Sequence, residues 1–113
     1  MLQLFPCKQE KKSVLSTKKL VNRYIALSRE RLLVLQAHET KLGHATVRSN
    51  HHLTELAKLS YHKSQPKRLV LFYKLTVLNK DGQAQAALRP RVFHVDEAAA
   101  LVKCLIRYIK AFR

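Results

Sequence analysis

The sequence predicts a small, mostly β domain that ends in a single α-helix. Two apolar runs, at 21–27 and 31–36, flank a polar turn at 28–30, as in a β-hairpin. An Asp-Gly pair at 81–82 divides a second, longer β-rich region. A helical stripe of apolar residues follows Asp96. An early hairpin, further strands and one closing helix are typical of small β-barrel modules, which usually bind a partner and seldom catalyse a reaction.

The length and the charge limit what the chain can be. At 113 residues it is expected to form one domain, and its 22 Lys and Arg against 7 Asp and Glu give a net charge of +15. This charge favours anionic partners, namely nucleic acid, an anionic phospholipid surface or an acidic protein. No apolar stretch approaches the roughly 20 residues of a membrane span, and the order of a secretory signal is missing. We therefore expect a cytoplasmic protein that can associate peripherally with a membrane.

The N-terminal part is predicted to be a basic arm over residues 1–12, followed by the domain proper over 13–113. A first short strand is expected between Ser13 and Thr17. The alternative is that the first 19 residues form a solvated basic tail.

The first hairpin is expected over Leu20–Gln36. Tyr24 and Ile25 favour a strand, and the continuous apolar run 32–35 is typical of a buried one. One long helix remains the alternative, because the residues of the turn are good helix formers and Gly and Pro are absent from it. A turn at 40–43 then leads to a short strand at 45–48.

The region 49–62 permits two interpretations. Ser49 or Asn50 can cap a helix that begins at His51, with leucines at 53, 56 and 59 along one face. The same leucines can introduce a strand over 56–62, which is the interpretation that we adopt.

The last third of the chain has the clearest pattern. A β-rich run over 67–78, the turn 79–82 and a return strand towards Val95 form a hairpin. Pro90 lacks a backbone donor, so the return strand is expected to lie at an edge or to bulge there. Asp96 is placed as the N-cap of the final helix, with Lys103, Arg107 and Lys110 on the side away from its apolar stripe.

The sequence shows no pattern of a catalytic or metal site. Cys7 and Cys104 have no Cys-x-x-Cys partner, and Cys104 is expected to be a buried apolar residue. The six histidines lack the paired helical spacing of metal ligands, and no Gly-rich phosphate loop or nucleophile elbow is present. We expect no enzyme activity, no metal and no cofactor.

The order and character of these segments resemble the pleckstrin-homology (PH) superfold. The run 22–28 followed by 31–35 is similar to the second and third strands of that family, and 53–61 with 69–74 to its fourth to sixth strands. The run 92–96 resembles its last strand and the start of its closing helix. The resemblance implies two antiparallel sheets in a barrel that the helix caps. The chain departs from the family by lacking its buried helix tryptophan and by having Val21 where headgroup-binding members carry a basic residue.

The resemblance implies a non-catalytic recruitment or scaffolding module. The candidate ligand site is a cluster of cations around the first hairpin that would present donors to phosphates: Lys11, Lys12, Lys18, Lys19 and Arg23. A groove beside the last helix would bind an acidic protein partner through Tyr61, Tyr73, Lys103, Arg107 and Lys110. The alternative to the cationic ligand site is a solvated charge run. The alternative function is a small nucleic-acid-binding protein, which the charge favours and the scarcity of aromatic residues disfavours.

Overall fold

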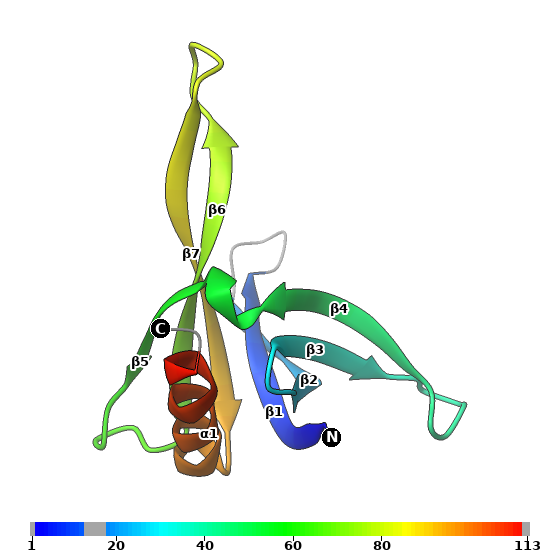
Figure 1. Ribbon diagram of the computed structural model, residues 1–113. Helices are drawn as coiled ribbons and strands as arrows, with labels where there is room; N and C mark the ends of the chain where they lie inside the picture. Colours follow the sequence, from blue (N-terminus) through cyan, green and yellow to red (C-terminus); the bar gives the residue numbers. More distant parts are fainter. Residues whose placement is uncertain (1, 13–17, 112–113) are drawn as a thin grey trace.

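The protein is mostly β with one C-terminal helix, as the sequence predicted (Figure 1). A computed structural model describes residues 2–12 and 18–111. In these two ranges, seven strands and a short 3-10 helix, η1, precede the α-helix. They follow the chain in the order β1 Gln3–Lys12, β2 Lys18–Leu27, β3 Arg31–Ala37, β4 Ala45–His52, η1 Leu53–Glu55, β5 Leu56–Tyr61, β6 Arg68–Leu78, β7 Ala84–Val95 and α1 Ala98–Lys110.

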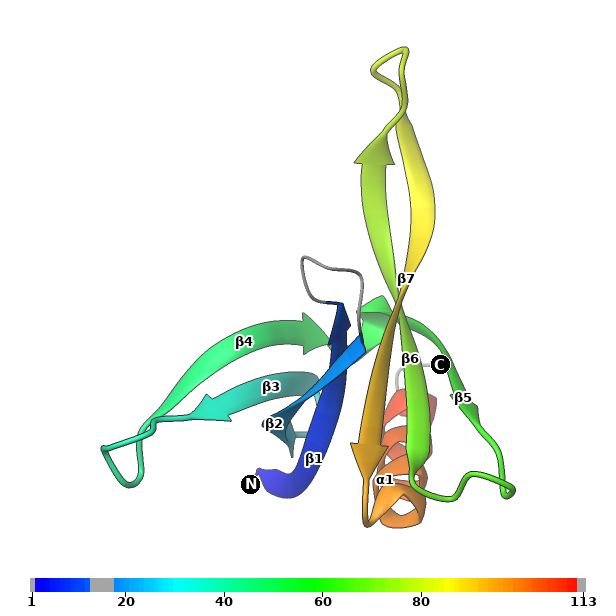
Figure 2. The ribbon, with the colours of Figure 1, turned by 180° about the vertical axis from the view of Figure 1, so that it is seen from behind.

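All seven strands belong to one open antiparallel sheet, in the order β4-β3-β2-β1-β7-β6-β5. The expectation of two sheets closed into a barrel is therefore wrong. The reason is that β1 pairs with β2 along its whole length and also with β7, through the register pairs that run from Cys7↔Val95 to Gln9↔Phe93. One strand thus joins the two halves of the sheet, while β4 and β5 lie at its two ends. Figures 1 and 2 show the β3–β4 and β6–β7 hairpins extending from the centre in different directions.

The N-terminal segment differs from the prediction. Gln3–Lys12, expected to be part of a basic arm, is strand β1 at the centre of the sheet. Its alternation explains why: Phe5, Cys7 and Gln9 are buried while their neighbours are exposed or half-buried. The strand expected between Ser13 and Thr17 lies outside the described residues.

The two predicted hairpins are confirmed. At the first turn the Ser28 amide donates to the Arg31 carbonyl at 2.9 Å, and the Ser28 hydroxyl accepts the Arg31 amide at 2.9 Å. These bonds join β2 to β3, so the alternative of one long helix is wrong. At the second turn the Asn79 side chain accepts the Asp81 and Gln83 amides, and Gly82 has φ +76°.

Both interpretations of the region 49–62 are partly right. Strand β4 continues to His52, and the helix that the leucine spacing suggested is only the three-residue η1. Strand β5 then begins at Leu56, as expected. The Leu53 amide donates to the Glu30 carbonyl at 2.8 Å and holds η1 against the first turn. The predicted strand at 45–48 and turn at 40–43 are also present.

The final helix begins one residue later than predicted. Its N-cap is Glu97, not Asp96, whose carboxylate instead lies 3.4 Å from the Lys67 ammonium. The apolar stripe is confirmed, because Leu101 and Leu105 are fully buried in the core that the helix shares with the sheet. The core also contains the buried side chains of the inner sheet face, among them Ile25, Leu27, Leu32, Leu69, Leu71, Phe93 and Val95.

Candidate functional site: a basic cavity

The inner face of the sheet changes from apolar to basic along its length. Residues that are paired across an antiparallel ladder share a face, and alternate residues of a strand return to that face. On β1 the inner positions Phe5 and Cys7 are followed along the strand by Gln9 and Lys11. On β7 the inner positions Val95 and Phe93 lead to Arg91. The same alternation that builds the core therefore directs cations toward one open end of the sheet.

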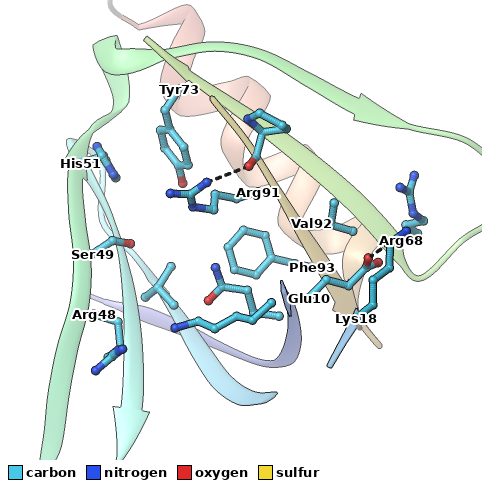
Figure 3. A pocket seen from close by; sticks show the side chains of 14 residues that line it. Glu10, Lys18, Arg48, Ser49, His51, Arg68, Tyr73, Arg91, Val92 and Phe93 are labelled. Atoms are coloured by element: carbon cyan, nitrogen blue, oxygen red, sulfur yellow. Dashed lines mark hydrogen bonds and ion pairs between the residues drawn. The ribbon is translucent and has the colours of Figure 1, made fainter. Parts of the chain in front are cut away.

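A cavity of about 630 Å³ occupies this end (Figure 3). It opens where β1 and β7 separate, because their pairing stops at Gln9 and Phe93 while both strands continue. Figure 3 shows side chains of β4 on one wall and those of β6 and β7 opposite. The lining residues are Gln9, Glu10, Lys11, Lys18, Val34, Arg48, Ser49, His51, Arg68, Tyr73, Pro90, Arg91, Val92 and Phe93.

The positive charges of the cavity repel one another. Burial and the neighbouring Arg48, Arg23 and Arg91 lower the pKa of Lys11. Burial and Arg48 also lower the pKa of Arg23, which the nearby Cys7 partly opposes. A group of cations that destabilise each other's charged forms is a place where an anion is favoured.

One carboxylate, Glu10, lies among the described lining residues, and its oxygens are engaged. One oxygen is 2.7 Å from His94 Nε2, and the other is 3.9 Å from Lys18 Nζ. Glu10 therefore offsets charge at the β1 rim. The ion pairs found among the described residues include none for Arg48 or Arg91.

Two buried polar atoms at this end have no hydrogen-bond partner among the described residues: Arg23 Nε and the Tyr73 hydroxyl. Arg23 is 9% exposed, and its side-chain Nη1 donates to the Asn22 carbonyl at 2.8 Å. Tyr73 is 4% exposed and lines the cavity. Burying a donor without a partner costs about 1–3 kcal/mol of folding stability, so both groups are expected to have a functional role.

The ring of Tyr73 is held in position from β4. His51 stacks on it with ring centroids 4.2 Å apart and an interplanar angle of 23°. The other side of His51 is fixed by Glu55, whose carboxylate oxygen lies 2.7 Å from Nδ1. Burial raises the pKa of Tyr73, an effect that Arg91 partly opposes, so its hydroxyl keeps its proton and can donate. The result is a fixed hydroxyl donor beside several cations.

This chemistry suits a phosphate group. Arginine presents a planar fork of donors that matches phosphate oxygens, and lysine adds a compact charge. The cations of the cavity come from five different strands, so they would surround a ligand instead of lying on one flat surface. Among the described residues, no three His, Cys, Asp or Glu side chains gather in the way that metal ligands do.

The predicted ligand residues are brought together in part. Lys11 and Lys18 line the cavity, and Arg23 is buried and coupled electrostatically to Lys11. Lys19 pairs with Lys11 in the ladder but is exposed. Lys12 is the last residue of β1, and its side chain lies outside what the structure describes.

Arg48, Arg91 and His51 line the cavity but were not among the predicted site residues. Arg91 could have been found, because it lies two positions before Phe93, a core residue of the same strand face. Arg48 could not, since it falls at the irregular register between β3 and β4, where the pairing passes from Ser49 to Val47.

The predicted partner residues lie in separate places. A groove of about 240 Å³ runs between β5 and α1, lined by Leu56, Ala57, Lys58, Leu59, Ile106, Ile109 and Lys110. Lys103 and Arg107 are exposed on α1, and Tyr61 donates to the Pro66 carbonyl at 3.1 Å. Tyr73 belongs to the basic cavity and does not line this groove.

Comparisons with protein-family models and with curated proteins gave no match for the chain. Among the described residues, no helix has the length and apolar character that crossing a membrane would require.

Proposed function

We propose that the protein is a non-catalytic, PH-like recruitment module that binds the phosphate groups of anionic phospholipids in its basic cavity. The observation that carries the proposal is the convergence of Lys11, Arg48 and Arg91 on a cavity that Tyr73 also lines, with a buried hydroxyl that has no hydrogen-bond partner among the described residues. A phosphate there would relieve the repulsion between the cations and accept from the hydroxyl. Each cation near an anionic leaflet contributes about 1 kcal/mol, so the five Lys and Arg of the cavity lining would give useful affinity.

The strand order supports the PH-like part of the proposal. Seven antiparallel strands in the order β4-β3-β2-β1-β7-β6-β5, followed directly by one helix against the core, agree with the resemblance seen in the sequence. Leu101 and Leu105 of the helix are fully buried, and we infer that they fill the space of the missing tryptophan. The continuous sheet departs from the resemblance, so the likeness rests on the order of elements and on the helix.

In this proposal, cations of the cavity would take the place of the one that the sequence motif lacks. Position 21 is Val21, half-buried on β2, where headgroup-binding relatives of the fold carry a basic residue. Arg48 from β4 and Arg91 from β7 approach the same cationic group from other strands. Phosphate recognition in this chain would therefore depend on residues outside the first hairpin.

The proposal is tested by vesicle co-sedimentation with two double variants of equal charge change. Arg48→Gln/Arg91→Gln removes two cavity cations, and Lys103→Gln/Arg107→Gln removes two exposed cations of α1. Vesicles are neutral, phosphatidylserine-rich or phosphoinositide-containing, across a salt series. We expect the cavity double variant to lose binding and the helix double variant to retain most of it. Equal losses would show that only net charge matters. Duplex or single-stranded nucleic acid is added as a competitor in an equal amount. If it displaces the protein from the vesicles, the nucleic-acid function is favoured instead.

A second function, binding of an acidic peptide, is favoured by the groove between β5 and α1. Strand β5 ends the sheet, so its outer edge has no partner strand among the described residues. An extended peptide could add to this edge, with apolar side chains in the groove and acidic ones near Lys58 and Lys110. This second function is tested by measuring the binding of a biotinylated library of acidic peptides to the wild-type protein and to the Ile106→Glu variant. Binding that Ile106→Glu does not weaken would exclude the groove.

A further inference from the structure

The hairpin of β6 and β7 continues well beyond the cavity as a two-stranded arm. Figures 1 and 2 show its outer part, residues 74–89, extending away from the sheet and from α1. The register pairs Lys74 with Leu88, Thr76 with Ala86, and Leu78 with Ala84, so these six residues share one face, which we call the arm face. All six are exposed, and Leu78 and Leu88 keep 75% and 56% of their surface accessible.

The arm face is continuous with the rim of the basic cavity. Alternation along β7 places Pro90 and Val92 on the same strand face as Leu88, opposite the inner residues Arg91 and Phe93, and both residues line the rim of the cavity. A shallow groove of about 350 Å³ on the arm is lined by Lys74, Leu75, Thr76, Ala86, Ala87 and Leu88. The exposed leucines of the arm therefore begin next to the rim of the cavity, on the opposite strand face from Arg91.

The charge of the arm is compatible with an anionic surface. Residues 74–89 carry three cations, Lys74, Lys80 and Arg89, and one carboxylate, Asp81. Exposed leucines beside cations fit the boundary of an anionic leaflet, where acyl chains meet charged headgroups. A second copy of the chain fits less well, because two copies would bring two net charges of +15 together.

We propose that the arm face enters the interfacial layer of the anionic membrane whose headgroups occupy the basic cavity. This inference rests on the proposed function. The arm lies along the membrane surface, with the side chains of Leu78 and Leu88 in the upper acyl region. Its depth is limited, because the outer edges of a two-stranded hairpin carry backbone groups that need water or headgroups as partners.

Single tryptophan reporters test the inference without background, since the chain has no tryptophan of its own. Leu78→Trp and Leu88→Trp place the reporter on the arm face, and Ile106→Trp places it on α1, where Ile106 is 41% exposed. Emission is recorded with phosphatidylcholine vesicles containing phosphatidylserine and a phosphoinositide, with co-sedimentation of the same samples. We expect the emission of both arm reporters to move to shorter wavelength on binding, and that of the Ile106→Trp reporter to stay unchanged.

A second variant measures the contribution to affinity. Leu78→Ser/Leu88→Ser should weaken vesicle binding about tenfold, the change that corresponds to about 1.4 kcal/mol, with an unchanged melting temperature because both side chains are exposed. Vesicle binding with no spectral change at the arm, or with full affinity in the serine variant, would overturn the inference and leave the cavity proposal standing. A blue shift that depends on protein concentration without vesicles would overturn it in favour of a second copy. Absence of any vesicle binding would overturn both proposals.

Discussion

The Tyr73 hydroxyl gives the sharpest prediction, because its removal should affect stability and binding in opposite directions. In the free protein this hydroxyl is buried and has no partner among the described residues. Tyr73→Phe keeps the stacked ring and deletes the unpaired group, which costs about 1–3 kcal/mol when buried. We expect the free energy of unfolding to rise by about 1 kcal/mol, which raises the melting temperature by about 4–8 °C in a domain of this size.

Tyr61→Phe is the matched control. The Tyr61 hydroxyl donates to the Pro66 carbonyl at 3.1 Å, so its loss should lower the free energy of unfolding by about 0.5–1.5 kcal/mol. Urea denaturation of both variants gives the two changes. In vesicle binding the order should reverse, with Tyr73→Phe weakened and Tyr61→Phe unaffected. Destabilisation by Tyr73→Phe, or full affinity in that variant, would refute the assignment of this hydroxyl as a reserved ligand donor.

Three further predictions follow from the core and the cavity. Burial raises the pKa of the Cys7 thiol from its ordinary 9.0 to about 11, an effect that Arg23 partly opposes. Because the folded state favours the protonated thiol, the contribution of Cys7 to the free energy of unfolding is complete below pH 9 and is lost as the pH rises through 11. The loss, about 2–3 kcal/mol, should appear as the difference between the pH profiles of wild type and Cys7→Ala in urea denaturation, and parallel profiles would contradict it. Leu105→Ala, at a fully buried position, should cost about 2–5 kcal/mol, whereas the exposed Ile106→Ala should cost far less; similar melting temperatures would mean that α1 does not close the core. Arg91→Gln should weaken vesicle binding about tenfold or more, because hydrogen bonds to charged groups are worth about 1.5–3 kcal/mol, and should leave thermal stability unchanged or higher because it relieves repulsion on Lys11; a large fall in melting temperature would indicate a structural role.

Elements with strong local signals could be predicted from the sequence. The Asn79–Gly82 turn, the turn after β2 and the stripe containing Leu101 and Leu105 depend on neighbouring residues, and all three are present. Pro90 lies in the part of β7 that β1 does not pair, which is a local edge as predicted. Long-range pairing could not be predicted, because the few residues of β1 that also pair with β7 carry no local signature. Those pairs determine whether the strands form two separate sheets or one continuous sheet.

The candidate site was predictable only where charge and strand alternation coincide. Lys11 and Lys18 were predicted as part of a cluster of cations around the first hairpin, and both line the cavity. Tyr73 was identified as a binding residue for a different partner, because its distance from His51 depends on β4 meeting β6 across the curved sheet. Arg48 depends on a register irregularity that no sequence pattern marks. Sites built from several strands are assembled by tertiary structure, and composition alone predicts only the sign of their charge.

The most direct measurement is a nuclear magnetic resonance titration of the ¹⁵N-labelled protein with a short-chain, water-soluble phosphoinositide. It asks whether the anion occupies the cavity or the whole basic surface. We expect amide shifts to concentrate at the cavity strands, around Lys11, residues 48–51 and residues 91–93, with saturation at one equivalent. Shifts spread over the exposed cations of α1 and the β3–β4 turn, without saturation, would contradict a discrete anion site.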